Sequence, residues 1–512
     1  MTIARNRLHA AAFAYLAMPT LVFFFGMVRA SVAIPCALAV LACVGLACRR
    51  RVSDFPKEED RGMKISFWGL LATVAIIAAW CLFGGEGGFN VICQTGDWKY
   101  RNAVFRDLLE KPWPVVYQNL DGALCYYIGH WLVPALPAKL VLAFGGTWES
   151  VWRVGNLALL AWTALGMVIA VFLLTACGTR RNTAGVLLAI VAFVLFGGLD
   201  VVGNWIMLGA TGRIAEINPF ARVETWAAPE FEFSSPTTLL FWAFNQAVPA
   251  FVATLLAWSE RTVRNWAVIV AALIICAPFP VAGLAFCMAI VAMCRFAVSC
   301  RAGQARKFLS DVFSVQNVLA VCMVAPVPLS YLFANSRSSS AVFCDGWNRD
   351  VALLFALFLL LEVGIYAGLV WKERKKEAWF YAMIVSLVIM PMITIGVKRV
   401  FGMRATIPAL TLLLLFVYRG LIGETRQRVR HMLLIAVFAI GMLTPTLEMV
   451  PLLRKTIAVW PNVTPCDKIV TFDQPYRDCI WKNFWALHPQ ESLFFRFFAK
   501  QVRKSTDEGG EK

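Results

Sequence analysis

About thirteen apolar segments, separated by polar or basic residues, constrain the fold of this chain most strongly. They lie near 8–27, 31–48, 66–83, 152–175, 183–198, 237–257, 266–277, 281–297, 316–333, 350–371, 378–396, 403–418 and 431–449. A helix crosses the hydrocarbon core of a bilayer with about 20 apolar residues, and most of these segments approach that length. The chain is 60% hydrophobic and only 15% charged, which excludes an ordinary soluble domain. We predict an all-α, polytopic membrane protein.

Short basic runs lie between the apolar segments at 49–51, 180–181, 372–376 and 426–430. The positive-inside rule places all four runs in the cytoplasm, with the N-terminus inside and the C-terminus outside. A net charge of +17 could indicate nucleic-acid binding, but these runs suit anionic lipid and no nucleic-acid motif is present. We therefore predict a multi-pass protein of the plasma membrane, the inner membrane of the cell.

The same rule divides the chain into three parts. Residues 1–65 form a helical hairpin with a basic cytoplasmic loop, residues 66–449 form the main membrane domain, and residues 450–512 form an external tail. The main domain has external loops at 84–150 and 197–236. Prolines at 278 and 280 divide a long apolar stretch into two short helices, and the run 120–146 is predicted to be re-entrant or interfacial. Cys466 and Cys479 lie in the tail, where a disulfide can form.

The stretch 95–121 concentrates acids, bases and aromatic residues between two apolar regions. A short helix is predicted to start after Asp97 and to stop at Pro112. One face of this helix is apolar: Trp98, Phe105, Leu108 and Leu109. Such a helix suits the membrane surface, with its acids facing water. Asp97 is therefore a candidate catalytic carboxylate, an N-cap, or both.

Three bases without an acid, Lys398, Arg399 and Arg404, follow in an external link. External links are usually poor in Lys and Arg, so this cluster indicates an anionic ligand. Phosphate is the natural candidate, because Arg binds it with a bidentate fork. The alternatives are contact with lipid headgroups and a salt bridge to Asp97 or Glu224.

The second external loop carries Asp200, Glu224 and Trp226. Carboxylates beside aromatic rings suit sugar binding, because rings stack on the apolar face of a hexose while carboxylates accept bonds from its hydroxyls. Trp98 and Tyr100 are candidates for the same role in the first loop, and interfacial anchoring is the alternative for all of these aromatic residues. Inside the membrane, Glu362 is the main anomaly, either a functional group or a neutral structural one.

Five blocks of sequence resemble a group of uncharacterised bacterial multi-pass proteins that we associate with the GT-C superfamily of glycosyltransferases. They are GDWKYRNAVFRDLLEKPWPVVY at 96–117, YYIGHWLVPALPAKL at 126–140, GGLDVVG at 197–203, RVETWAAPEFEFSSPTTLLFWAFNQAVPAF at 222–251 and MRATIPAL at 403–410. The resemblance implies many transmembrane helices, an acid in the first large external loop and a polyprenyl-phosphate sugar as donor. It suggests Asp97 as the loop acid and Arg404 as a contact of the donor phosphate.

Two features depart from that superfamily. The acidic loop follows the third helix instead of the first, so an additional N-terminal hairpin is implied. Lys398, Arg399 and Val400 occupy the place where an Asn-Asp pair is expected. The second departure leaves open whether a divalent cation takes part. No metal-binding spacing such as CxxC is present.

We predict an inverting glycosyl transfer at the outer face of the membrane. Asp97 acts as general base, Arg404 with Lys398 or Arg399 neutralises the departing phosphate, and Glu224 and Trp226 hold a sugar. The first alternative is a transporter or flippase for a lipid-linked or anionic solute, in which Glu362 and Lys139 are the important residues. The second is a non-catalytic scaffold in envelope assembly. The identity of sugar and acceptor is left open.

Overall fold

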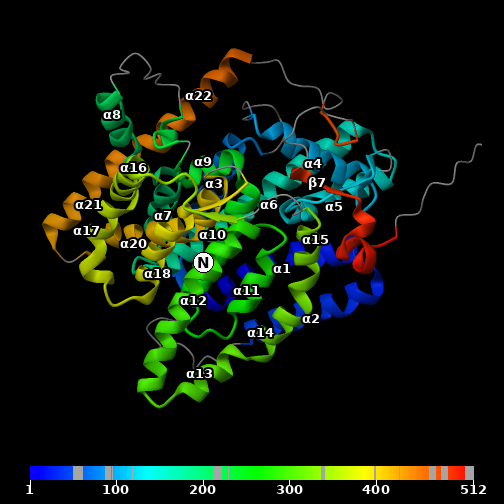
Figure 1. Ribbon diagram of the computed structural model, residues 1–512, viewed down its shortest axis with the longest axis horizontal. Helices are drawn as coiled ribbons and strands as arrows, with labels where there is room; N and C mark the ends of the chain where they lie inside the picture. The colour runs from blue at the N-terminus through cyan, green and yellow to red at the C-terminus, as the bar shows by residue number, and fades with distance from the viewer. Residues whose placement is uncertain are drawn as a thin grey trace, which may run out of the picture.

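The computed structural model describes residues 1–49, 62–86, 94, 96–117, 120–211, 222–228, 230–335, 341–396, 399–425, 427–459, 469–473 and 483–501. Helices make up nearly all of its regular structure, and the strands form three sheets of two or three short strands (Figure 1). The all-α prediction is confirmed. Three residues that entered the predictions lie outside these ranges: Lys398, Cys466 and Cys479.

Nine helical stretches in the described part of the chain are long and apolar enough to cross a membrane. They are α1 (Arg5–Met27), α2 (Ala30–Cys48), α6 (Trp148–Cys177), α7 (Thr183–Leu195) with α8 (Asp200–Thr211), α12 (Pro278–Arg301), α13 (Ala305–Val312) to α15 (Pro326–Phe333) through α14 (Val315–Leu319), α16 (Arg349–Leu359) with α17 (Ile365–Arg374), α20 (Ile407–Arg419) with the π-helical turn Gly420–Glu424, and α21 (Arg428–Gly441) with α22 (Leu443–Val459). The molecule is therefore a membrane protein with several spans.

Four other predicted segments are also helical but shorter: α3 (Phe67–Phe83), α10 (Phe244–Ser259), which follows the short helix α9 (Pro236–Trp242), α11 (Trp266–Leu273) and α18 (Ala378–Ile389). Every segment of the predicted set is thus a helix, while the number of crossings stays a prediction. Helix α5 (Gly129–Ala143) has 15 residues, or about 22 Å, which is short for a crossing.

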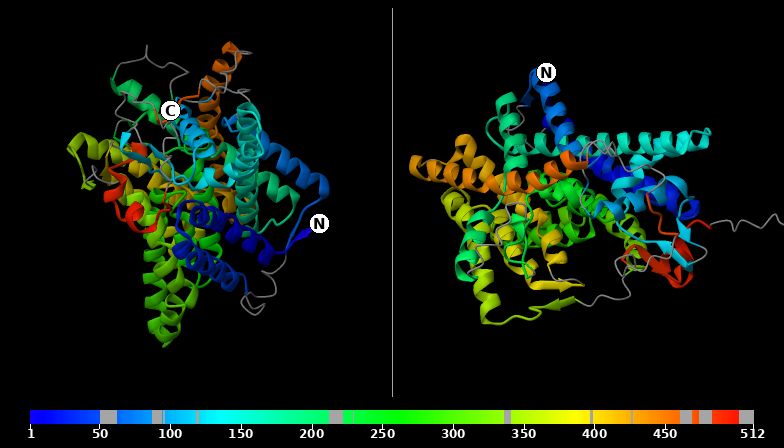
Figure 2. Two further views of the ribbon diagram at one scale, coloured as in Figure 1. Left: turned by 90° about the vertical axis from the view of Figure 1, so that its right-hand side faces the viewer. Right: turned by 90° about the horizontal axis from the view of Figure 1, so that it is seen from above.

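The prolines that divide the stretch 266–297 act as predicted. Pro278 stands in the first turn of α12, where its missing N–H leaves no helical bond unmade, and α11 ends before it at Leu273. The two helices form a hairpin with α12 as the longer arm. Figure 2 shows α12 and α13 extending away from the rest of the molecule.

Basic residues from separate connections gather at one end of the molecule. The N–H of Lys64 donates to the carbonyl of Arg181 at 3.0 Å, where strand β2 (Met63–Lys64) pairs with β1 (Thr2–Ile3). Arg5, near the start of α1, donates to the carbonyl of Ser259 at 3.5 Å. Arg374 pairs with Glu424 at 2.5 Å. This grouping agrees with the positive-inside rule, although which side of a membrane it faces stays a prediction.

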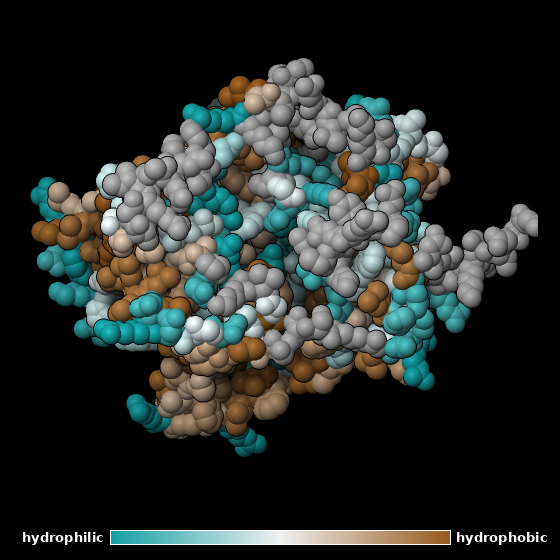
Figure 3. All heavy atoms as spheres, turned by 45° about the horizontal axis from the view of Figure 1, so that its top comes forward, coloured by the Kyte–Doolittle hydropathy of each residue, from teal (hydrophilic) through white to brown (hydrophobic). Residues whose placement is uncertain are grey.

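Hydrophilic and apolar surfaces separate on the outside of the molecule. Figure 3 looks toward the end that carries α8 and α22, where hydrophilic surface gathers in the middle of the face and apolar surface flanks it. Many of the exposed apolar side chains belong to the long helices, for example Leu38, Leu353 and Met432. Such residues suit contact with lipid chains.

Helix α4 (Trp98–Glu110) begins and ends where the sequence predicts, but it does not use its apolar face for lipid. Trp98, Phe105, Leu108 and Leu109 are all buried, because this face packs against α5 and α6. The prediction that this apolar face rests on the membrane surface is therefore wrong. Lys139 of α5 donates to the carbonyls of Leu109 and Lys111 at 3.3 and 2.7 Å, so it caps the end of α4.

The end of the described chain returns to the first loop. Strand β7 (Trp485–Leu487) pairs antiparallel with β4 (Gly122–Leu124), which pairs with β3 (Val116–Tyr117). The following π-helical turn, Phe494–Phe498, packs its first ring against Phe23 of α1 at 5.8 Å. A further two-stranded sheet joins β5 (Ala341–Phe343) to β6 (Ile393–Ile395). The predicted tail is therefore part of the folded body where it is described.

Asp107 of α4 anchors a second piece of the C-terminal region. Its Oδ2 accepts bonds from the hydroxyl of Tyr117 at 2.7 Å and from the N–H of Phe472 at 3.1 Å. Its Oδ1 is buried without a hydrogen-bond partner among the described residues. Burial raises the pKa of Asp107 to about 6, and the two hydrogen bonds oppose this rise only in part. A neutral carboxyl therefore suits this position.

Replacing Asp107 by Asn should flatten the pH dependence of stability. The folded pKa lies above the unfolded one, so the carboxyl favours the folded state at low pH and loses this contribution as pH rises through about 6. The loss is about 3 kcal/mol at most, and the amide, which carries no charge, avoids it. We expect equal melting temperatures for both proteins near pH 4 and a higher one for the variant at pH 8. A lower melting temperature of the variant at every pH would contradict a neutral Asp107.

Candidate functional site

Arg404 lies on α19 (Val400–Ala405), a short helix held tightly against the start of α12. Phe401 meets Phe279 edge to face, with ring centroids 5.6 Å apart. A Cβ placed on Gly283 of α12 would lie only 1.7 Å from the carbonyl oxygen of Ala405. Only glycine permits this approach of the two backbones, so the position of Arg404 depends on it.

The surroundings of Arg404 come from three distant parts of the chain. Burial of the guanidinium lowers its pKa, but the acidic groups of Tyr127, Tyr126, Asp97 and Glu232 outweigh this effect and raise the pKa above its usual value. The first loop, the second loop and the link before α20 therefore converge, as predicted. Among the described residues, Arg404 makes no ion pair within 4 Å, and its buried Nε has no hydrogen-bond partner.

Asp97 occupies the N-cap position of α4, but its side chain makes no capping hydrogen bond. The carboxylate instead pairs with Arg101 of the same helix at 3.4 Å. The Asp97 side chain is 45% exposed, while that of Arg101 is only 5% exposed. The carboxylate is thus oriented by a buried cation and still open to a ligand. The capping interpretation of Asp97 is not the one that the structure favours.

An aromatic wall lies beside these charges, and sequence reasoning had not assigned it a role. Tyr126 and Tyr127, just before α5, have ring centroids 3.6 Å apart. Phe484, from the returning C-terminal segment, packs against Tyr126 at 4.4 Å and against Tyr100 at 5.8 Å. The negative charge of an ionised Tyr126 would be stabilised by Arg101 and Arg404, so Tyr126 lies near both cations. Tyr127 and Tyr100 are only half-buried.

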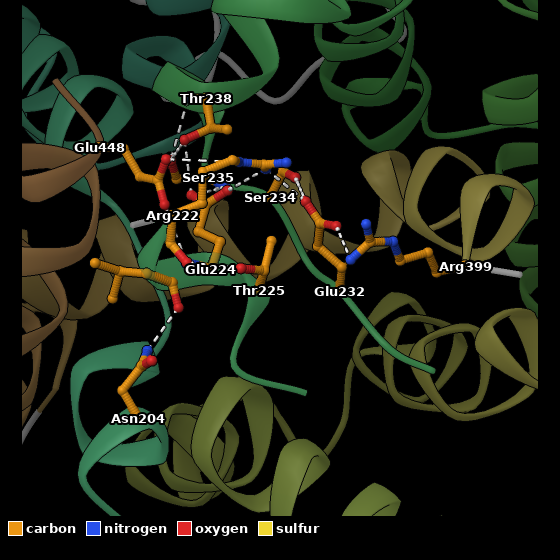
Figure 4. Close-up of polar contacts among 11 residues, drawn as sticks. Asn204, Arg222, Glu224, Thr225, Glu232, Ser234, Ser235, Thr238, Arg399 and Glu448 are labelled. Atoms are coloured by element: carbon orange, nitrogen blue, oxygen red, sulfur yellow. Dashed lines mark hydrogen bonds and ion pairs between the residues drawn. The ribbon is translucent and has the colours of Figure 1, made fainter. Parts of the chain in front are cut away.

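Arg399 does not stand free for a phosphate. Its guanidinium pairs with Glu232 at 3.1 Å, and its backbone has a φ of +62°, a left-handed conformation that is costly for a residue with a Cβ. Glu232 also pairs with Arg222 at 2.7 Å (Figure 4). The ion pairs tie the link before α20 to the second loop. Arg399 therefore holds that link against the second loop in this structure.

Glu224 is fully buried in the same polar network, on a single turn of 3-10 helix, Val223–Thr225. Its Oε1 accepts bonds from the N–H of Ser235 at 2.9 Å and from the hydroxyl of Thr238 at 2.8 Å (Figure 4). Burial raises the pKa of Glu224, and Glu448 and Asp200 raise it further. The carboxyl fixes the start of α9. It does not face a sugar.

The glycines of the block 197–203 allow three close contacts. The backbone at Gly197 approaches the carbonyl of Gly441, the position of a Cβ on Gly198 falls 1.5 Å from Oε2 of Glu362, and that on Gly203 falls 2.4 Å from the ring of Trp226. Any residue larger than glycine would clash at each of these three positions. The block is therefore a packing motif that brings α8 against the helices around it.

Trp226 and Trp98 are core residues as well. Trp226 is 7% exposed, and its indole N–H donates to Oε1 of Glu362 at 3.1 Å. Trp98 is 1% exposed, stacks on Phe244 at 4.9 Å, and donates to the carbonyl of Phe241 at 2.7 Å. Neither ring is open to a sugar. Of the predicted aromatic contacts, only Tyr100 retains accessible surface beside Asp97.

Glu362 lies on a π-helical turn, Leu360–Gly364, between α16 and α17. Its carboxyl hydrogen-bonds to that of Asp200 on α8 as well as to Trp226. Two ionised carboxylates can only accept hydrogen bonds, so a bond between these two groups requires a proton on one of them. A small cavity of about 20 Å³, enough for one water, lies beside Glu362.

The predicted site residues thus separate into two groups. Asp97, Tyr100 and Arg404 come together around Tyr126 and Tyr127, whereas the acids and tryptophans of the second loop build its support. The adjacent tyrosines before α5 were the one available signal for the wall. Among the described residues, no group of three or more His, Cys, Asp or Glu side chains is arranged to hold a metal ion. No protein-family model, no curated protein and no solved structure matches this chain.

Proposed function

We propose that the chain is a membrane glycosyltransferase. It moves a sugar from a polyprenyl-phosphate donor to an envelope glycan or lipid acceptor at the outer face of the plasma membrane. One observation carries the proposal: the accessible carboxylate of Asp97 and the half-buried guanidinium of Arg404, which has no ion pair among the described residues, share one electrostatic environment. The basic connections gather at another end of the molecule, which supports an external position for this site.

Asp97 supplies the base. It accepts the proton of the acceptor hydroxyl as the oxygen attacks the anomeric carbon, on the side opposite the phosphate, and the sugar is transferred with inversion. The pairing with Arg101 at 3.4 Å turns the carboxylate without covering it. The bond from the anomeric carbon to the phosphate oxygen breaks in the same step, and the phosphate leaves on the lipid.

Arg404 stabilises the departing phosphate. Negative charge builds up on that group in the transition state, and a half-buried guanidinium is screened less by bulk water than an exposed one. Its Nε has no hydrogen-bond partner among the described residues, so this N–H can donate to a phosphate oxygen. Arg399, held by Glu232, positions the link that precedes α19, and Tyr127 and Tyr100 offer half-buried ring surface for the sugar.

The direct test measures transfer from radiolabelled polyprenyl-phosphate sugars in membranes that contain the chain. We expect labelled glycan or lipid product with at least one donor, and none in matched membranes that lack the chain. Folded protein that transfers nothing from any such donor would contradict the proposal and favour an envelope-assembly scaffold. Adding and chelating divalent cations in the same assay determines whether a cation takes part.

The proton-sharing pair of Asp200 and Glu362 favours transport as a second candidate function. π-Helical turns often occur at functional sites, and buried carboxyls within spans can carry protons. Lys139, the other residue that the transport hypothesis uses, only caps α4. The pair also has a structural explanation, because it joins α8 to the turn that holds Trp226.

Replacing Glu362 by Gln separates these two roles. The amide can accept from Trp226 and donate to Asp200, so a structural pair should tolerate it with unchanged protein level and less than a threefold loss of sugar transfer. Transfer is measured at several pH values in membranes with equal amounts of each protein. Normal abundance with lost, pH-insensitive function would instead indicate a proton-carrying role. Glu362→Ala, which leaves Trp226 without its acceptor, is the destabilised control.

A further inference from the structure

A cavity of about 550 Å³ lies far from Arg404, between the end of α12, helix α13 and the turn from α17 to α18. Helix α12 starts beside α19, and its 24 residues carry the chain about 36 Å away to Arg301. The cavity is therefore separate from the site around Asp97. Its charged lining is strongly basic: Arg261, Arg295, Lys307 and Lys376, with Asp311 as the one acid in that lining.

Arg295 is the lining residue with the most firmly held side chain. Its guanidinium lies over the ring of Trp266 at 5.0 Å, and Nη2 donates to the carbonyl of Glu260 at 3.4 Å. These two contacts fix the orientation of the Arg295 guanidinium. The other terminal nitrogen, Nη1, is buried and has no hydrogen-bond partner among the described residues. A buried N–H group without an acceptor can be satisfied by an ordered water or by a bound anion.

The acids around the turn from α17 to α18 do not supply that acceptor, because other arginines engage them. Glu377 pairs with Arg374 at 2.9 Å and with Arg419 at 3.1 Å. Glu373 pairs with Arg430 at 2.8 Å. The basic lining of the cavity therefore keeps its excess of positive charge.

The cavity also borders apolar surface suited to lipid chains. Val298 of α12 lines it and is 66% exposed, and Met293, one turn earlier, is 63% exposed. Helix α13 has no buried residue, and Phe313 just after it is 71% exposed. A basic helix with exposed apolar side chains lies at the interface of a bilayer, where it meets anionic headgroups.

We propose that this cavity binds the phosphate of an anionic phospholipid. Arg295, Lys307 and Lys376 surround the phosphate, and the acyl chains run along the exposed side of α12. A soluble phosphate ester offers the same anionic group without the chains, so the two sources can be distinguished by experiment. The proposal does not depend on glycosyl transfer, since its readout is binding.

The test uses the purified full chain in a zwitterionic detergent. Its melting temperature is followed during titration with phosphatidylglycerol, phosphatidylcholine or glycerol 3-phosphate. We expect saturable stabilisation by phosphatidylglycerol only. The double variant Lys307→Gln/Lys376→Gln should weaken that apparent affinity at least fivefold. The control Arg306→Gln/Lys375→Gln removes the same charge from exposed neighbours outside the lining and should change it less than twofold.

Three results would overturn the proposal in different ways. Equal losses in the two double variants would show only general surface attraction, and equal stabilisation by phosphatidylcholine would show that no anion is recognised. Stabilisation by glycerol 3-phosphate as strong as that by phosphatidylglycerol would assign the cavity to a soluble ester.

Arg295→Lys keeps the charge and loses the fork, so it should weaken phosphatidylglycerol binding without changing the melting temperature in plain detergent by more than a few degrees.

Discussion

Replacing Asp97 by Asn should lower sugar transfer about a hundredfold or more, because the amide cannot accept the proton of the acceptor hydroxyl. Folding should not suffer. The side chain makes no capping bond, and the amide oxygen of the variant can still accept a hydrogen bond from the buried Arg101. Initial rates from a radiolabelled polyprenyl-phosphate sugar, in membranes with equal amounts of protein, give the measurement.

Glu110→Gln is the matched control for that variant. Glu110 lies on the same helix, pairs with Arg106 at the same spacing and is 47% exposed, but it stands at the other end of α4. We expect its transfer rate to stay within twofold of the original protein. Equal rates for all three proteins would remove Asp97 from the mechanism.

The other half of the site responds to geometry as well as to charge. Arg404→Lys keeps the positive charge but loses the planar fork, so use of the donor should fall by roughly tenfold to a hundredfold in kcat/KM. The same membranes and donor serve for this measurement. An unchanged kcat/KM in the Arg404 variant would mean that the phosphate binds elsewhere.

Gly283→Ala should have the second large effect. The new Cβ would need the space 1.7 Å from the Ala405 oxygen, and a backbone atom cannot move aside as a side-chain end can. Helix α19 must shift and carry Arg404 with it. We expect a loss of about 1–3 kcal/mol in stability, and a displacement of about 1 Å can cost a hundredfold in rate.

Gly368→Ala is the control for this change, because nothing lies within 4 Å of a Cβ at that position of α17. It should leave the rate unchanged and add up to about 1 kcal/mol of stability. Melting temperature and transfer rate are measured for both variants. A Gly283 variant that melts and transfers like the Gly368 variant would show that α12 and α19 separate without consequence.

The helices could be predicted because apolar length and proline position are local signals. The break at Pro278 and the limits of α4 both follow from a few neighbouring residues. The role of an aromatic residue is different, since it depends on which distant segment covers it. The sequence presents Trp98 and Trp226 as residues that could bind a sugar. In the structure Phe244 stacks on Trp98, and Glu362 accepts the N–H of Trp226.

The same reasoning explains the missed aromatic wall. Strands of two or three residues carry no periodic signal, so the pairing of β7 with β4 could not be predicted. Without that pairing nothing places Phe484 beside Tyr100 and Tyr126. Asp97 and Arg404 were identified because charge at an unexpected position is visible in the sequence alone.

The pairing of β7 with β4 also determines when, during synthesis of the chain, the aromatic wall can form. A ribosome delivers the first loop early, but β7 follows the last of the long helices in the chain. Phe484 can therefore join Tyr126 only after translation has passed α22, so a nascent chain up to that point carries an incomplete aromatic wall. The ability to bind a ligand there arises only once the segment that contains β7 has been synthesised.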